Sequence, residues 1–115
     1  MSTSTRRSTF RRLRDQADVF AALGDDTRLR ILSELSDGDR RSITRLAEGS
    51  PLTRQAVTKH LRVLERAGLV RGERRGRENL FRVEAGTLRD ARDALDRVSR
   101  HWDRALARLK AHVED

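Results

Sequence analysis

Residues 42–83 read SITRLAEGSPLTRQAVTKHLRVLERAGLVRGERRGRENLFRV, and this stretch decides the fold. It predicts a short helix, a tight turn, a second helix with basic residues on its outer face, and a β-hairpin with arginines at its tip. A helix of this kind suits the major groove of duplex DNA, and a cationic hairpin beside it suits the backbone or the minor groove. The pattern therefore indicates binding rather than catalysis.

The second helix of the stretch, residues 53–67, has two faces when its positions are placed roughly 100° apart. Val57, Leu61 and Leu64 share one side, which we expect to face the core. The opposite side carries groups that pair with base edges, and the N-terminal half of such a helix normally reads the bases. The predicted base contacts are Arg54, Gln55, Thr58 and Lys59, and the predicted backbone and hairpin contacts are Arg62, Arg74, Arg75 and Arg77.

Two plainer interpretations stand beside this one. An amphipathic surface helix often has a basic polar face, and arginines on a hairpin can serve as a solvated edge that discourages strand aggregation. The helix-turn-helix spacing and the hairpin that follows at once favour DNA when they are taken together. His60 lies on the flank near the core, and we expect it to be a packed histidine rather than a base reader.

Glycines and capping residues mark where the other helices begin and end. Gly24, Gly38 and Gly68 each follow an apolar periodic stretch and are expected to be left-handed C-caps. A first helix is expected to end at Leu23. The next three helices are expected to start near Asp25 or Asp26, at Ser42 and at Thr53, and a last helix to start at a Thr87–Asp90 capping box. The apolar residues expected to point inward before the hairpin are Leu29, Ile31, Leu32, Leu35, Ile43, Leu46 and Ala47.

The last helix carries a heptad repeat. One track is Leu88, Leu95, Trp102 and Leu109, and a second is Ala91, Val98, Ala105 and His112. A small domain cannot easily cover so long a stripe, so pairing with a second copy explains it better than packing on the chain's own core. Trp102 is the expected anchor, because large aromatic side chains dominate interface energy. The predicted dimer interface comprises Phe20, Leu88, Leu95, Val98, Trp102, Leu106 and Leu109.

Composition sets the remaining bounds. The 115 residues suit one domain, and 26 basic against 18 acidic residues give a net charge of +8, which favours a polyanionic partner. The chain has no cysteine, no membrane-length apolar run and no apolar signal core in its first fourteen residues. We therefore expect a cytoplasmic protein without a membrane role. Residues 1–14 are interpreted as a flexible basic arm in preference to an organellar transit peptide, and residues 15–115 as the folded domain.

The residues also resemble a known family. The run from Phe20 to Leu32, FAALGDDTRLRIL, is similar to the opening signature of the ArsR/SmtB regulators. The run from Thr53 to Val70 looks like their recognition helix and first wing strand, and Gly76-Arg77-Glu78 with Phe81 looks like their wing. The resemblance covers about residues 17–113. It implies a mainly α fold with a small β-hairpin wing, in which a winged helix-turn-helix forms a homodimer through the first and last helices. It also implies repression of transcription at an imperfect inverted repeat.

Many members of this family sense metals, and here the sequence departs from their pattern. Ser42 and Thr44 stand where the family has paired cysteines. On the last helix, the family's Asp-x-His followed by His-x-x-Glu is represented by Ser99-x-His101 and His112-x-x-Asp115. The two histidines lie roughly 16 Å apart along one helix, so they could share zinc only across two subunits. The ending resembles the metal-free branch of the family, and we expect no metal and no cofactor.

The sequence thus predicts a non-enzymatic, sequence-specific transcriptional regulator whose partners are double-stranded DNA and a second copy of itself. The alternatives are a nonspecific architectural DNA-binding protein, a protein-binding module on the same fold, and a zinc-responsive repressor that uses His101, His112 and Asp115 between subunits. A hydrolase is remote, because no catalytic triad spacing and no phosphate loop is present. The sequence does not identify an inducer.

Overall fold

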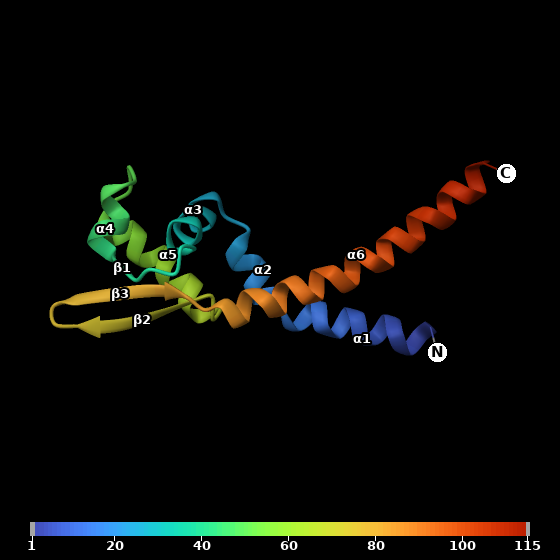
Figure 1. Cartoon of the computed structure of the whole chain (residues 1–115), viewed down its shortest axis with the longest axis horizontal. Helices are drawn as coiled ribbons and strands as arrows, with labels where there is room; N and C mark the ends of the chain where they lie inside the picture. The colour runs from blue at the N-terminus through green and yellow to red at the C-terminus, as the bar shows by residue number, and fades with distance from the viewer. Residues whose placement is uncertain (1, 115) are drawn as a thin grey trace. The chain divides into compact units, whose positions relative to one another are not determined.

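The computed structural model describes residues 2–114, which fall into two compact units. One unit is Asp18–Leu88, and the other joins the residues up to Ala17 with those from Arg89 onward. In chain order the elements are α1 (Ser2–Asp15), α2 (Ala17–Leu23), α3 (Asp26–Leu35), β1 (Arg41–Ser42), α4 (Ile43–Glu48), α5 (Arg54–Arg66), β2 (Val70–Arg75), β3 (Glu78–Val83) and α6 (Ala85–Glu114) (Figure 1). None of the helices in residues 2–114 is long and apolar enough to cross a membrane.

The β-hairpin predicted from the arginine-rich segment is present. Strands β2 and β3 pair antiparallel with Arg75 opposite Glu78, which leaves Gly76 and Arg77 as a two-residue turn. Gly76 has a φ of +61°, the left-handed conformation that such hairpin turns require. Strand β1, which was not predicted from the sequence, pairs with β3 and completes a sheet of order β1-β3-β2. Two residues are too few to show the alternation by which a strand is recognised.

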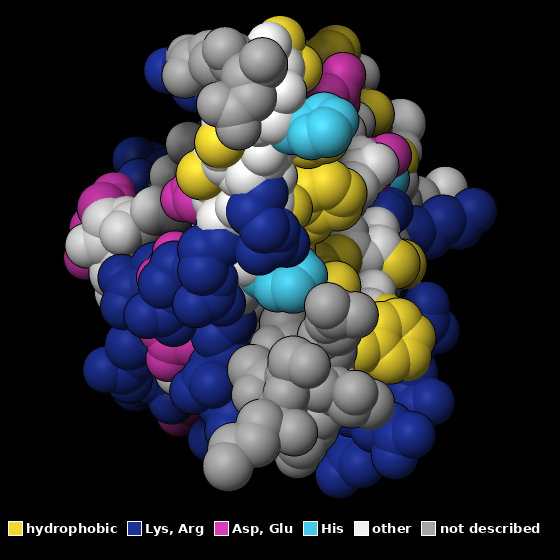
Figure 2. All heavy atoms as spheres, turned by 90° about the vertical axis from the view of Figure 1, so that its right-hand side faces the viewer, with side chains coloured by type: hydrophobic (Ala, Val, Ile, Leu, Met, Phe, Trp, Pro, Cys, Tyr) yellow, Lys and Arg dark blue, Asp and Glu magenta, His cyan; other side chains and the backbone are white. Residues whose placement is uncertain are grey.

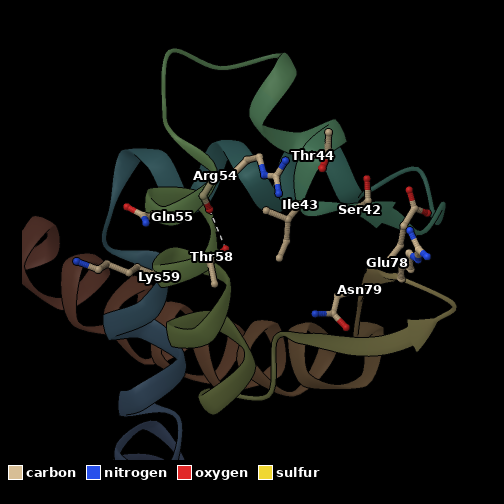
Figure 3. Close-up of a pocket in the computed structure, with 10 residues that line it drawn as sticks. Ser42, Ile43, Thr44, Arg54, Gln55, Thr58, Lys59, Glu78 and Asn79 are labelled. Atoms are coloured by element: carbon tan, nitrogen blue, oxygen red, sulfur yellow. Dashed lines mark hydrogen bonds between the residues drawn. The ribbon is translucent and has the colours of Figure 1, made fainter.

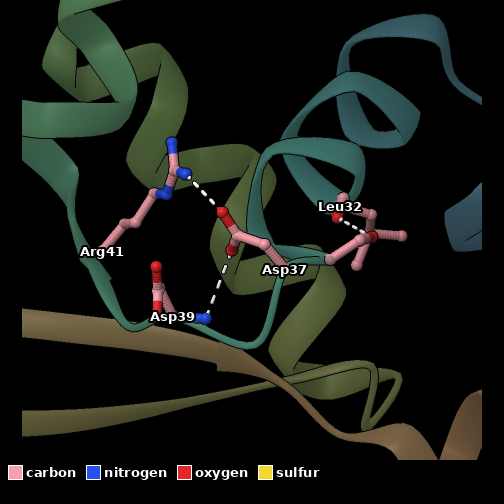
Figure 4. A network of polar contacts seen from close by, with 5 residues as sticks. Leu32, Asp37, Asp39 and Arg41 are labelled. Carbon is pink, nitrogen blue, oxygen red and sulfur yellow. Dashed lines mark hydrogen bonds and ion pairs between the residues drawn. The ribbon is translucent and has the colours of Figure 1, made fainter.

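A carboxylate organises the loop that leads into β1. The Arg41 guanidinium donates to Asp37 Oδ2 at 2.8 Å, and the Asp39 amide donates to Asp37 Oδ1 at 3.2 Å (Figure 4). These hydrogen bonds, the backbone one first, hold the pKa of Asp37 below its ordinary value although partial desolvation opposes them. Gly38 beside it has a φ of +86°. Local hydrogen bonds therefore hold this loop in place, and the sequence contains no strand pattern that would predict β1.

The core of the Asp18–Leu88 unit is built mainly from leucine. The predicted inner faces of α3 and α5 are confirmed by complete or nearly complete burial of Ile31, Leu32, Leu35, Val57, Leu61 and Leu64. Leu46 of α4 is also buried, whereas Ile43 and Ala47 are half-buried. Leu29 was expected inside and is 49% exposed. At 100° per residue, Leu29 lies about 110° around α3 from the mean direction of the three buried α3 residues. Its side chain therefore points away from the core.

Three of the helix starts are capped as predicted. Asp25, Ser42 and Thr53 accept hydrogen bonds from the backbone amides of Arg28, Arg45 and Ala56 at 3.0, 3.1 and 3.1 Å. Each bond satisfies an amide that the helix itself leaves free. The loops before α3, α4 and α5 are thereby tied to the helices that follow them.

Two of the predicted boundaries are wrong. Gly24 lacks the positive φ seen at Gly38 and Gly68, so it is no left-handed cap. The Thr87–Asp90 capping box does not open α6, because the helix already begins at Ala85. The carbonyl of Glu84 accepts from the amides of Thr87 and Leu88, which places Thr87 inside the first turn.

The N-terminal segment also differs from its prediction as a flexible arm over residues 1–14. Where the structure describes it, this segment is α1, a helix over Ser2–Asp15. Residues 2–15 contain neither glycine nor proline and are rich in arginine, which has a high helix propensity. The expected first helix is consequently split, with α2 following α1 after Gln16.

Candidate nucleic-acid interface

A groove of about 710 Å³ lies between α5 and the hairpin, within the Asp18–Leu88 unit (Figure 3). One wall is the N-terminal half of α5, with Arg54, Gln55, Thr58 and Lys59. The other walls are the start of α4 and the hairpin tip, with Ser42, Ile43, Thr44, Arg77, Glu78 and Asn79. All four base contacts predicted from the sequence therefore line one groove, which is open to solvent.

The core holds the polar face of α5 outward. Val57, Leu61 and Leu64 have no exposed surface, and at helical spacing they leave the opposite face free. Arg54, Gln55 and Lys59 are accordingly exposed. The Thr53 cap fixes where the helix begins, and with it the direction in which these side chains project.

Thr58 differs from its neighbours because its hydroxyl is already engaged. Thr58 Oγ1 donates to the carbonyl of Arg54 at 2.7 Å, and the side chain is half-buried (Figure 3). A hydroxyl donates one hydrogen bond and accepts up to two. In this arrangement Thr58 offers the groove a methyl group and a hydrogen-bond acceptor rather than a donor.

The predicted backbone contacts do not form one cluster. Only Arg77 lines the groove, and Arg62 lies farther along the exposed face of α5. Arg74 and Arg75 are neighbours in a strand and so project from opposite faces of the hairpin. Arg75 Nε lies 3.7 Å from Glu73 Oε1, and Arg74 Nε donates to the Gly76 carbonyl over 3.4 Å. All four side chains are exposed and remain candidates for contacts with phosphates.

The residues on the other walls of the groove were not predicted from the sequence as site residues, apart from Arg77. Asn79 pairs with Arg74 in the hairpin register, on the same sheet face as Phe81, and its side chain projects toward the groove in Figure 3. Glu78 was expected only as part of the segment that resembles the family's wing. No local pattern marks these positions, because their place in the groove follows from the strand register.

His60 lies on the flank of α5, away from the residues that line the groove. It is half-buried, and its Nδ1 lies 3.8 Å from Asp25 Oδ2. The pKa of Asp25 is lowered, first by the hydrogen bond from the Arg28 amide and further by the positive charges of Arg28 and His60, with partial desolvation opposing them. This position suits the packed histidine that the sequence predicts.

The apolar stripe of α6 is open in the single chain. Leu95, Trp102, Leu106 and Leu109 are between 50 and 61% exposed, and Val98 is half-buried. Phe20 and Leu88, in the other unit, are half-buried as well. The predicted stripe is therefore an exposed surface from Leu95 onward, whereas Ala91 of its second track is buried within the chain. Its pairing with a second copy stays a prediction.

The two histidines of α6 are far apart along the helix. His101 and His112 lie on one uninterrupted helix, eleven residues or roughly 16 Å apart, and Asp115 lies outside the described residues. In the part of the chain that the structure describes, no group of three histidine or acidic side chains is arranged to hold a metal.

Comparisons with known proteins agree with this geometry. Residues 23–73 match the family model described as "Helix-turn-helix domain". The structure of an ArsR-like transcriptional regulator from Rhodococcus sp. RHA1 is 41% identical, with a TM-score of 0.75 over 93% of this chain and 94% of that one. A transcriptional regulator of the HTH type from Mycobacterium tuberculosis is 36% identical over 76% of this chain and 78% of its own length.

A further neighbour is a homodimeric winged helix-turn-helix DNA-binding domain from Mycobacterium bovis, a possible ArsR-family regulator. It is 30% identical, with a TM-score of 0.62 over 77% of this chain and 82% of that one. These relatives share the fold built above, and their class is regulatory rather than enzymatic. The chain belongs to the ArsR/SmtB family of winged helix-turn-helix, DNA-binding transcriptional regulators.

Proposed function

We propose that the protein is a homodimeric repressor that binds an imperfect inverted repeat in a promoter. The observation that carries the proposal is the wall of the groove formed by α5, where four polar side chains line a groove open to solvent and the opposite, apolar face is fully buried. A helix presented in this way can enter the major groove, where arginine or lysine pairs with guanine and glutamine with adenine. We also propose that the protein acts in the cytoplasm, which holds the chromosomal DNA in the bacteria from which its relatives come.

In this proposal Arg54, Gln55 and Lys59 supply hydrogen bonds to base edges. Thr58 supplies its methyl group and an acceptor, which suits a thymine methyl or the amino group of cytosine or adenine. Contacts to phosphates position the protein without reading sequence. We assign those contacts to Arg62, Arg74, Arg75 and Arg77.

The two-fold symmetry of a dimer would match the symmetry of an inverted repeat. A two-fold pair of recognition helices reads two half-sites about one DNA turn, near 34 Å, apart. The open stripe of α6 supplies an apolar surface for such a pair, through Leu95, Val98, Trp102, Leu106 and Leu109 together with Leu88 and Phe20. Occupation of the promoter by the dimer would then exclude the polymerase.

The test is selection of bound sites from random duplex DNA, followed by titration of selected and random duplexes at fixed salt. We expect an inverted repeat to emerge and to bind far more tightly than the random duplex, as specific sites do. A ratio near one would favour the architectural alternative. Transcription from a promoter that carries the selected site should fall when the protein is added, and a rise would contradict repression.

Two single changes separate base reading from backbone binding. Gln55→Ala should relax the preference at one position of each half-site by about 1–3 kcal/mol, because one bidentate pair is removed. Arg75→Ala should weaken all duplexes alike and lower the salt slope of the dimer by about two units if each of its two copies neutralises one phosphate. An equal loss of specificity in both variants would contradict this division of roles.

A further inference from the structure

The net positive charge of the chain is concentrated in α1 rather than in the winged unit, Asp18–Leu88. Helix α1 contains five arginines and one acidic residue, Asp15, a net charge of +4. The Asp18–Leu88 unit, which holds the groove, contains fourteen basic and eleven acidic residues, a net charge of +3. One short helix therefore carries more net charge than the whole DNA-reading unit.

Three of these arginines form a stripe on α1. Arg7, Arg11 and Arg14 follow a spacing of four and three residues, which places them within about 60° of one another around the helix. All three side chains are exposed, and none forms an ion pair with another described side chain. On the face drawn in Figure 2, side chains of lysine and arginine flank a strip of hydrophobic ones.

Arg12 provides a contrast on the same helix. It lines a recess together with Asp15, Asp90 and Asp93, so acidic groups of its own unit lie near its charge. None of Arg7, Arg11 and Arg14 lines this recess. Like charges at this helical spacing repel one another and destabilise a helix. A polyanion bound to the three arginines would relieve this repulsion.

We infer that the stripe of Arg7, Arg11 and Arg14 binds the phosphate backbone of the DNA that the protein occupies, as a sequence-independent anchor. Guanidinium groups bind phosphate oxygens in a bidentate manner. The three positions span about 10 Å along the helix, close to the axial rise of three nucleotides in one strand. The inference rests on the proposed function, because it assumes a duplex already held by α5.

The test compares three triple variants of the full chain with the unaltered protein, on a random-sequence duplex several turns long and at several salt concentrations. The first replaces Arg7, Arg11 and Arg14 with glutamine, and the second replaces them with lysine. The matched control replaces Arg100, Arg104 and Arg108, an exposed stripe of α6, with glutamine and so removes the same charge. Far-UV circular dichroism confirms that each variant keeps its helices.

We expect the glutamine variant of α1 to bind random duplex more weakly, with a salt slope reduced by about 0.9 for each phosphate that the protein no longer neutralises. The lysine variant should retain most of the affinity, and the α6 control should change much less. The ratio between the affinities for selected and random duplex should stay the same in all three, because an arginine bound to phosphate reads no sequence.

The outcomes separate this inference from the proposed function. An unchanged slope in the α1 glutamine variant, or an equal change in the α6 control, would overturn the anchor while leaving α5 as the reader. Loss of binding to phosphatidylserine vesicles without loss of binding to DNA would overturn it in favour of a lipid surface. An unaltered protein without affinity for any duplex would overturn both proposals.

Discussion

Helices α5 and α6 are both amphipathic, but the apolar side of α5 is buried in the fold whereas much of the apolar side of α6 is exposed. In α5 the apolar side chains Val57, Leu61 and Leu64 have no exposed surface. In α6 the residues Trp102, Leu106 and Leu109 are each more than half exposed. Both helices show an apolar side at helical spacing in the sequence.

This difference between α5 and α6 shows what an apolar stripe in a sequence predicts and what it leaves open. An apolar stripe shows that a surface is to be covered, because exposed apolar area is costly in water. It does not show whether the chain's own fold or another molecule covers it. In α5 the covering elements come from the same unit, whereas in α6 an open stripe remains, as expected of a surface that joins two copies.

The largest expected effect is in the core behind α5. Leu61→Ala should lower the free energy of unfolding by about 2–5 kcal/mol, because it removes buried apolar atoms and leaves a cavity. The matched change on the open stripe, Leu106→Ala, should cost within about 0.5 kcal/mol in dilute, monomeric protein. Denaturant titrations of both variants at low concentration measure the two values, and similar losses would erase the contrast between the helices.

Next in size is the removal of Trp102 from the open stripe. Trp102→Ala should weaken dimerisation by at least about 2 kcal/mol, roughly thirty-fold in the dissociation constant, if this side chain anchors the interface. Sedimentation equilibrium over a range of concentrations measures it. A wild-type chain that stays monomeric at every concentration would show that another partner covers α6.

The N-terminal residues of the two helices give a further comparison between α5 and α6, with a smaller expected loss of stability. Thr53 caps α5, whereas Thr87 lies inside the first turn of α6. Thr53→Ala should therefore cost about 1 kcal/mol of unfolding free energy, and Thr53→Ser much less. Thr87→Ala should cost less than Thr53→Ala by thermal or denaturant unfolding, and the reverse order would mean that Thr87 caps the helix after all.

The smallest effect concerns pH. The pKa of Asp25 is lowered in the folded chain from an ordinary value of 3.8, chiefly by the Arg28 amide and further by Arg28 and His60. A lowered pKa makes the folded state favour the carboxylate, so this contribution is complete above pH 3.8 and is lost as the pH falls through the folded value. Asp25→Asn should flatten the acid side of the stability profile, and an unchanged profile would exclude this role.

Much of the functional surface was readable before the fold was known. The orientation of α5, its Thr53 cap and the four residues that line the groove follow from the spacing of residues within and next to this helix of thirteen residues. The hairpin followed from the composition of its turn around Gly76. These are local properties, because a helical face and a tight turn are set by residues close together in the chain.

Other features of the structure could not be predicted from residues close together in the chain. Strand β1, the place of Asn79 in the groove and the exposure of Leu29 depend on which distant segments meet. The bond from Thr58 to the Arg54 carbonyl depends on a side-chain rotamer. Strand pairing and rotamer choice are decided by packing across the chain, and a pattern along the chain leaves them open.

The sequence by itself determined that two amphipathic helices and a basic hairpin would form, since periodicity and turn chemistry act over a few residues. Only the tertiary structure decided that α5 turns four polar side chains into one groove with the hairpin tip, while the stripe of α6 stays open. The physical reason is that burial depends on the surfaces that distant segments bring together.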